Sequence, residues 1–175
     1  MVKLLLKDPR ADVRALSKEG WSALHYAAFE GHVEVVKLLL GDPRVEVRAV
    51  DENGWSALHF AAGDGHVEVV NLLLEDPRVD ANARTNNYKT PLHLAASKNH
   101  HKVVRLLLDS PQLSTANCVD NIDQWSPVMT ALKTESKDAL EELLNHPKVS
   151  LGTIDGTGRN LEMVARWVLC NQIEI

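Results

Sequence analysis

The sequence lacks long blocks of like charge, long apolar runs and clustered cysteines. Its 24 acidic and 19 basic residues give a net charge of −5 but are dispersed, so no electrostatic footprint for nucleic acid or an anionic membrane is visible. No apolar run is long enough for a signal-peptide core or a membrane span. Cys118 and Cys170 lie far apart without metal-type spacing, which fits reduced thiols in a cytoplasmic or nuclear protein, although one disulfide between them stays open.

Catalytic motifs are also missing. The sequence has no Ser/His/Asp set and no Cys-x-x-Cys pair, and Gly152, Gly156 and Gly158 do not follow a strand as the glycines of a nucleotide-binding loop do. We therefore expect a protein that is not an enzyme, that needs no cofactor and that has neither nucleic acid nor membrane as its partner.

The chain does contain a pattern that repeats every 34 residues. The stretch 20–40 returns almost unchanged as 54–74, and a third copy follows from Thr90. A fixed period of this length is typical of a stacked array, in which each unit buries its apolar face against its neighbours. Function should then lie on an extended surface rather than in a pocket.

Each unit is predicted to contain two helices and a projecting loop. Hydroxyl residues suited to cap a first helix recur at one position of the unit: Ser22, Ser56, Thr90 and Ser126. Glycines end that helix at Gly31 and Gly65, and Asp-Pro-Arg triplets stop the second helix. The alternating stretch from Val45 to Gly54, which ends in Asn-Gly, predicts a hairpin-like finger with short β content. Five such fingers are expected in a row.

Residues 90–96 (Thr-Pro-Leu-His-Leu-Ala-Ala) and the string 31–40, with its copy at 65–74, resemble the ankyrin repeat consensus. The resemblance covers essentially the whole chain. It implies an all-α solenoid of helix-turn-helix units with projecting β-hairpin-like fingers, and a role in protein binding. The fourth unit departs from the pattern, because Ser126 follows Thr90 by 36 residues and Met129 takes the place of the recurring histidine.

We predict a single ankyrin domain over residues 1–175. Its full repeats are 17–50, 51–84, 85–119 and 120–154, and partial repeats are 1–16 and 155–175. Because both ends fall inside a repeat, we expect the chain to be part of a longer protein.

Two sets of residues recur in register with the repeat. His25, His59 and His93 are a full repeat apart, so we interpret them as structural groups that bond between units rather than as metal ligands. His100 and His101 are expected to form a surface pair. The arginines Arg10, Arg44 and Arg78 are expected to pair with the aspartates of their own triplets, or else to bind an acidic peptide.

Aromatic residues suggest where a partner binds. Trp21, Trp55 and Trp125 share the position before the first helix, where the third unit has Lys89. In proteins that this chain resembles, that position faces a concave groove, together with the two residues before the helix-ending glycine. The resemblance therefore implies these partner contacts: Trp21, Phe29, Glu30, Trp55, Asp64, Lys89, Lys98 and Trp125.

Two other functions remain open from the sequence. The repeats would be a structural spacer if the groove stays empty within a larger multidomain protein. Alternatively, the rings of Trp21, Phe29 and Trp55 could surround a methylated lysine, with Glu30 and Asp64 supplying the negative charge. In that case the chain would be a reader of methyl-lysine peptides.

Overall fold

The computed structural model describes residue 8 and residues 12–150, and these form eight helices and no strand. The first helix of each pair is α2 (Ala23–Phe29), α4 (Ala57–Gly63), α6 (Pro91–Ser97) or α8 (Pro127–Lys133). The second is α3 (Val33–Leu40), α5 (Val67–Glu75), α7 (His101–Asp109) or α9 (Lys137–Asn145). The predicted C-terminal partial repeat and the fifth finger lie outside the described residues.

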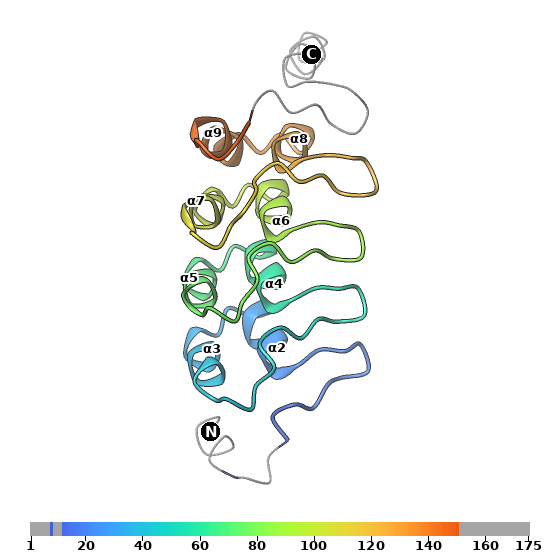
Figure 1. Ribbon diagram of the computed structural model, residues 1–175, viewed down its shortest axis with the longest axis vertical. Coiled ribbons are helices and arrows are strands. Elements are labelled where there is room, and N and C mark those ends of the chain that lie inside the picture. The colour runs from blue at the N-terminus through green and yellow to red at the C-terminus, as the bar shows by residue number, and fades with distance from the viewer. Residues whose placement is uncertain (1–7, 9–11, 151–175) are drawn as a thin grey trace.

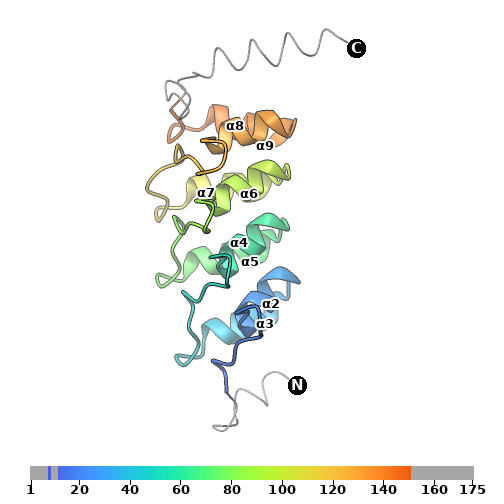
Figure 2. The ribbon, with the colours of Figure 1, turned by 90° about the vertical axis from the view of Figure 1, so that its right-hand side faces the viewer.

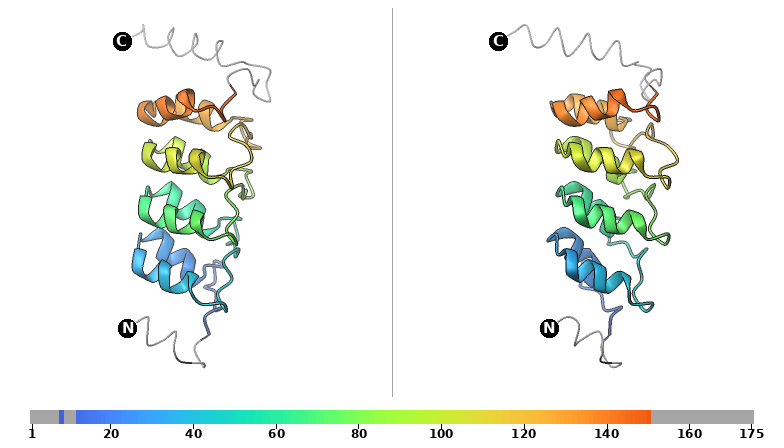
Figure 3. Two further views of the ribbon diagram at one scale, coloured as in Figure 1. Left: turned by 60° about the vertical axis from the view of Figure 1, so that its left-hand side comes forward. Right: turned by 90° about the vertical axis from the view of Figure 1, so that its left-hand side faces the viewer.

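The helices stand in two columns, as Figure 1 shows. The inner column, α2, α4, α6 and α8, lies beside the projecting loops, and the outer column consists of α3, α5, α7 and α9. Side views show the pairs following one another along the long axis (Figure 2 and Figure 3). The predicted all-α solenoid is therefore confirmed. Its core is a continuous row of leucines, valines and alanines from every described pair.

The inner helices begin where the hydroxyl residues predict. Ser56 Oγ accepts a hydrogen bond from the backbone amide of His59, and His59 Nδ1 accepts one from the backbone amide of Ser56. The same reciprocal capping occurs in α2 and α6. In α8, where Met129 has no ring nitrogen, Ser126 caps the helix alone. The capping satisfies amides that the first helical turn leaves without partners.

The fingers are turns rather than strands. The backbone amide of Asp51 donates to the carbonyl of Trp55 at 3.0 Å, and Asp51 Oδ1 accepts from the amides of Asn53 and Trp55. Adjacent tips are joined by single backbone bonds, such as that from the Asn86 amide to the Asn53 carbonyl. The alternating Val45 and Val47 are buried against the core. The predicted hairpin-like shape therefore comes from a closed turn, and the β content expected for Val45 to Gly54 is absent.

The third finger contains a conformation that should be unfavourable. Tyr88 has φ 58°, at the position where the first two fingers have Gly20 and Gly54. A side chain in this left-handed region costs about 1 kcal/mol, and the Tyr88 side chain is 48% exposed, so burial does not offset the cost.

We expect Tyr88→Gly to raise the free energy of unfolding by about 1 kcal/mol, because glycine adopts this conformation without steric conflict. Urea denaturation measures the change. Tyr88→Ala is the matched control, because it removes the same ring and the same Arg84 contact but keeps the left-handed side chain. Equal stabilisation by the two variants would contradict the prediction.

Candidate functional site

Five aromatic rings gather where the first two fingers meet the inner helices: Trp21, Tyr26, Phe29, Trp55 and Phe60. We call them the aromatic cluster. Phe60 of α4 is its centre and is only 5% exposed. The centroid of its ring lies 4.4 Å from that of Trp21, 5.1 Å from that of Trp55 and 6.0 Å from that of Phe29. Because finger-base rings touch rings on α2 and α4, the cluster lies at the inner corner between fingers and helices.

Within the aromatic cluster, exposure is uneven. The side chains of Tyr26 and Phe29 are 48% and 39% exposed, whereas Trp21 and Trp55 are partly buried. Large exposed apolar groups therefore come from α2 more than from the tryptophans. Sequence reasoning missed Tyr26 and Phe60, although a signal was present. Tyr26 and Phe29 are three residues apart on one helix face, and Phe60 occupies the repeat position of Tyr26.

The C-caps of the inner helices are Glu30, Asp64, Lys98 and Thr134. Lys98 Nζ donates to Asp64 Oδ1 at 3.0 Å, so these two predicted contacts pair with each other across adjacent repeats. The side chains of Glu30 and Lys89 make no hydrogen bond or ion pair with the part of the chain that the structure describes. They are therefore free to pair with a ligand.

Trp125 lies apart from the aromatic cluster, at the base of the fourth finger. Its ring lies under the ammonium of Lys133, at 5.9 Å from the ring centroid. The eight predicted contact residues thus form three groups along the stack. The ring group is Trp21, Phe29 and Trp55, the ion pair is Asp64 and Lys98, and Trp125 lies with Lys133. Glu30 and Lys89 belong to none of these groups and have no ion-pair partner in the described part of the chain.

The rings do not enclose a space for a quaternary ammonium between the two tryptophans. Phe60 occupies the region between Trp21 and Trp55, so the rings pack on one another. Lys98 already neutralises Asp64. An aromatic cage for methyl-lysine would need an open centre between the rings, and of the two carboxylates expected beside it Asp64 is already paired. This geometry gives no support to the methyl-lysine hypothesis.

The sequence matches a known protein family over most of its length. The family described as Ankyrin repeats (3 copies) matches residues 1–85, 42–120 and 77–155. The chain belongs to the ankyrin repeat family. Ankyrin repeats are generally protein–protein interaction modules.

Curated relatives are similar over a short stretch. Over 36 residues, the chain is 58% identical to Notch-regulated ankyrin repeat-containing protein A of Danio rerio. It is 56% identical over 36 residues to the Notch-regulated ankyrin repeat-containing protein of Homo sapiens. In both cases the match covers 21% of this chain and 31% of the relative. The chain therefore spans about a third of the length of these relatives.

The recurring histidines of the ankyrin units have structural roles. Nδ1 of His59 and of His93 accepts the N-cap amide of its own helix. Nε2 then carries the proton and donates to a carbonyl of the next unit, Lys89 for His59 at 3.1 Å and Trp125 for His93 at 3.0 Å. Burial lowers the pKa of each ring to about 4. The neutral rings are thus fully used in capping and in joining repeats, as the structural interpretation predicted.

A second row of histidines lies at the N-caps of the outer helices. His66 Nε2 bonds to the Phe29 carbonyl at 2.8 Å, and His100 Nε2 bonds to the Gly63 carbonyl at 3.1 Å. A Cβ atom at Gly65 would lie 2.6 Å from the ring of His100. The expectation that His100 is a surface residue was therefore wrong, since its ring is partly buried and ties α7 to the preceding unit.

The arginines of the Asp-Pro-Arg triplets pair with aspartates. Arg78 binds Asp76 through two hydrogen bonds of 2.9 and 2.6 Å, and Arg44 binds Asp42 in the same way. These hydrogen bonds lower the pKa of both carboxyls. Arg78 Nη2 also donates to the Leu40 carbonyl at the end of α3. Pairing and helix capping therefore account for Arg44 and Arg78, while Arg10 lies outside the described residues.

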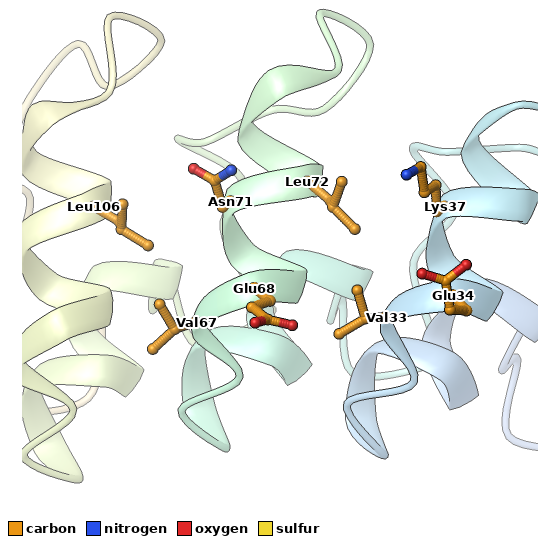
Figure 4. A pocket seen from close by; sticks show the side chains of 8 residues that line it. All are labelled: Val33, Glu34, Lys37, Val67, Glu68, Asn71, Leu72 and Leu106. Atoms are coloured by element: carbon orange, nitrogen blue, oxygen red, sulfur yellow. The ribbon is translucent and has the colours of Figure 1, made fainter.

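A separate hollow of about 370 Å³ lies among the outer helices (Figure 4). Apolar side chains of α3, α5 and α7 line it together with polar ones: Val33, Val67, Leu72, Leu106, Glu34, Lys37, Glu68 and Asn71. It contains none of the predicted contact residues, and it gives the molecule a second surface to be compared with the aromatic cluster in binding experiments.

The described residues offer neither a metal site nor a membrane span. Over residue 8 and residues 12–150, no three His, Cys, Asp or Glu side chains converge in a way that could hold a metal ion. Within the same ranges, no helix is both long and apolar enough to cross a membrane.

Proposed function

We propose that the chain binds a protein or peptide partner through the concave surface formed by the fingers and inner helices, and that it is not itself an enzyme. The observation that carries this proposal is the pair of exposed rings, Tyr26 and Phe29, of which Phe29 packs on the buried Phe60 and Tyr26 on Trp21. Large aromatic side chains that stand exposed on a rigid support are typical of binding hot spots.

The proposed contact surface has the predicted residues as its members, with Tyr26 added from the structure. It runs along four ankyrin units and includes the finger tips. The proposed contacts are Trp21, Tyr26, Phe29, Glu30, Trp55, Asp64, Lys89, Lys98 and Trp125. Since Glu30 and Lys89 have no ion-pair partner among residues 12–150, a ligand that supplies opposite charges to them gains affinity without breaking a pair seen there.

We also propose an intracellular location. Cys118 is a free thiol within the described part of the chain, and its partial burial raises its pKa, so the unreactive thiol form predominates. The relatives' names state that those proteins are Notch-regulated, but the shared 36 residues are about one repeat long. Those names therefore do not identify the partner of this chain.

Replacing Tyr26 and Phe29 together by serine tests the proposed function. Affinity capture from a cell lysate identifies a partner, and calorimetry then compares its affinity for the parent and for Tyr26→Ser/Phe29→Ser. We expect affinity to fall about 30-fold or more, because removing aromatic hot spots costs roughly 2 kcal/mol or more. Both side chains are substantially exposed, and Ser97 already occupies the position of Phe29 in the third unit, so the variant should remain folded.

The control is Leu144→Ser on the outer helix α9, whose side chain is 37% exposed, close to that of Phe29. It removes a similar exposed apolar group away from the proposed surface. Unchanged partner affinity in the Tyr26→Ser/Phe29→Ser variant would overturn the proposal. If Leu72→Ser lost affinity for the partner instead, binding would lie at the hollow among the outer helices. If no variant captured a partner, the spacer function would be favoured.

A further inference from the structure

The charged residues of the concave surface are divided by sign along the stack. In each unit the finger-base residue and the last two residues before the left-handed turn form what we call the groove floor. Charges on the floor of the first two units are Glu30 and Asp64, and those on the next two are Lys89, Lys98 and Lys133. The finger tips are mixed in sign, with Lys18, Glu19, Glu52 and Asp123. The groove floor is therefore acidic toward the N-terminus and basic toward the C-terminus.

The two ends of the groove floor are not neutralised internally. Asp64 and Lys98 pair with each other at the middle. Among the described residues, the carboxylate of Glu30 and the ammonium of Lys89 have no ion-pair partner, and Lys133 contacts only the ring face of Trp125. The negative charge of Glu30 and the positive charges of Lys89 and Lys133 therefore remain available to a ligand.

The acidic end coincides with the aromatic cluster. Glu30 follows Phe29 directly, and Phe29 packs against Trp21 and Phe60. A guanidinium or ammonium group is favoured next to an aromatic face and a carboxylate together. At the basic end Lys98 is paired with Asp64, and the ammonium groups of Lys89 and Lys133 favour a carboxylate from the ligand. The two ends thus select side chains of opposite charge.

We propose, resting on the function proposed above, that the partner is an extended polypeptide segment with separated charges. Arg or Lys beside an apolar residue binds at Phe29 and Glu30, and Asp or Glu binds at Lys89 or Lys133. Neighbouring helices pack at ~10 Å, so Lys89, two units from Glu30, lies ~20 Å from it, and Lys133, three units away, lies ~30 Å from it. An extended chain rises ~3.3 Å per residue, which sets the cation and the acid about six to nine residues apart.

The experiment pans a random twelve-residue phage-displayed peptide library on the full chain and removes peptides that also bind Tyr26→Ser/Phe29→Ser. The expected result is enrichment of peptides with a cationic and an acidic residue at this separation. For one selected peptide, Glu30→Lys should weaken binding about 10-fold or more because like charges then meet. Changing the peptide's Arg or Lys to Glu should restore affinity for Glu30→Lys. The control, Glu34→Lys on α3, makes the same charge change away from the floor and should leave affinity unchanged.

The outcomes separate this inference from the function on which it rests. Peptides that need Tyr26 and Phe29 but show no charge separation, or no rescue by the charge swap, overturn the inference and leave the concave binding function standing. If the variant Tyr26→Ser/Phe29→Ser removes all the peptides that bind the parent, both proposals are overturned. Failure to select any peptide overturns the inference, because an extended segment then has no affinity for the floor, while the captured partner still tests the function.

Discussion

Phe60→Ala is expected to lower the free energy of unfolding by about 3–5 kcal/mol, as for other buried phenylalanines. Phe60 is 5% exposed. It contacts Trp55 of its own unit and three rings of the preceding unit: Trp21, His25 and Phe29. Truncation leaves a cavity that the stacked helices cannot fill without leaving their close-packed positions. Urea denaturation measures the loss, and tryptophan fluorescence should report greater solvent contact of Trp21 and Trp55.

The chain supplies its own control for this substitution. Leu94 occupies the position of Phe60 in the third unit and is also buried. Phe60→Leu should therefore cost less than about 1.5 kcal/mol, because leucine fills much of the same space. If Phe60→Ala destabilised no more than Phe60→Leu, the ring would not be the centre of the aromatic cluster.

These expectations restrict how the binding surface is to be probed. Phe60 packs directly on Phe29 and on Trp21, which in turn contacts Tyr26, so its removal lowers stability and affinity together and cannot separate the two. Tyr26 and Phe29 lie at the edge of the aromatic cluster and are 48% and 39% exposed. Substitutions at these two positions therefore report on binding, whereas substitutions at Phe60 report on folding.

The helices could be predicted from the sequence because their signals are local. Ser56 and His59 cap a helix through hydrogen bonds three residues apart, and Gly65, with φ 75°, makes the left-handed turn after that helix ends. Each signal depends on the geometry of a single turn, which the residue type largely determines. Repetition at a fixed period then extends the assignment from one unit to its neighbours.

The aromatic cluster was only partly predictable, because it depends on contacts between units. Phe60 packs on Trp21 of the preceding unit, 39 residues earlier in the sequence, and no local pattern shows how far each ring is buried. The hydrogen bond from His100 to the Gly63 carbonyl was missed for the same reason.

The fourth finger differs from the others in length. The backbone amide of Asp120 donates to the carbonyl of Trp125, which closes a turn one residue longer than that of Asp51 and Trp55. The extra residue in the fourth finger lengthens the turn, but the backbone hydrogen bond that closes the turn is kept.

Buried histidines make the stability of the stack depend on pH. The pKa of His59 and that of His93 are each lowered by burial from 6.5 to about 4, so folding strongly disfavours their protonation. Asp51 and Asp80 favour protonation of His59, and Asp120 does so for His93, but burial outweighs them. The pKa of His25 is lowered for the same reason. Asp42 and Asp76 contribute in a separate range, because their carboxyls have pKa values below 3.8.

Lowering the pH from 7 to 4 is therefore expected to destabilise the folded chain well before those carboxyls titrate. Below pH 6.5 the unfolded chain binds protons at His59 and His93 that the folded chain refuses until about pH 4, so stability falls throughout this range. At about 1.4 kcal/mol per pKa unit, each histidine accounts for about 3 kcal/mol. Urea denaturation at pH 7 and pH 4.5 measures the loss.

The control is His59→Gln/His93→Gln, because glutamine can retain the capping bonds but does not titrate. The free energy of unfolding of this variant should depend less steeply on pH. An equally steep pH dependence in that variant would show that other groups cause the loss.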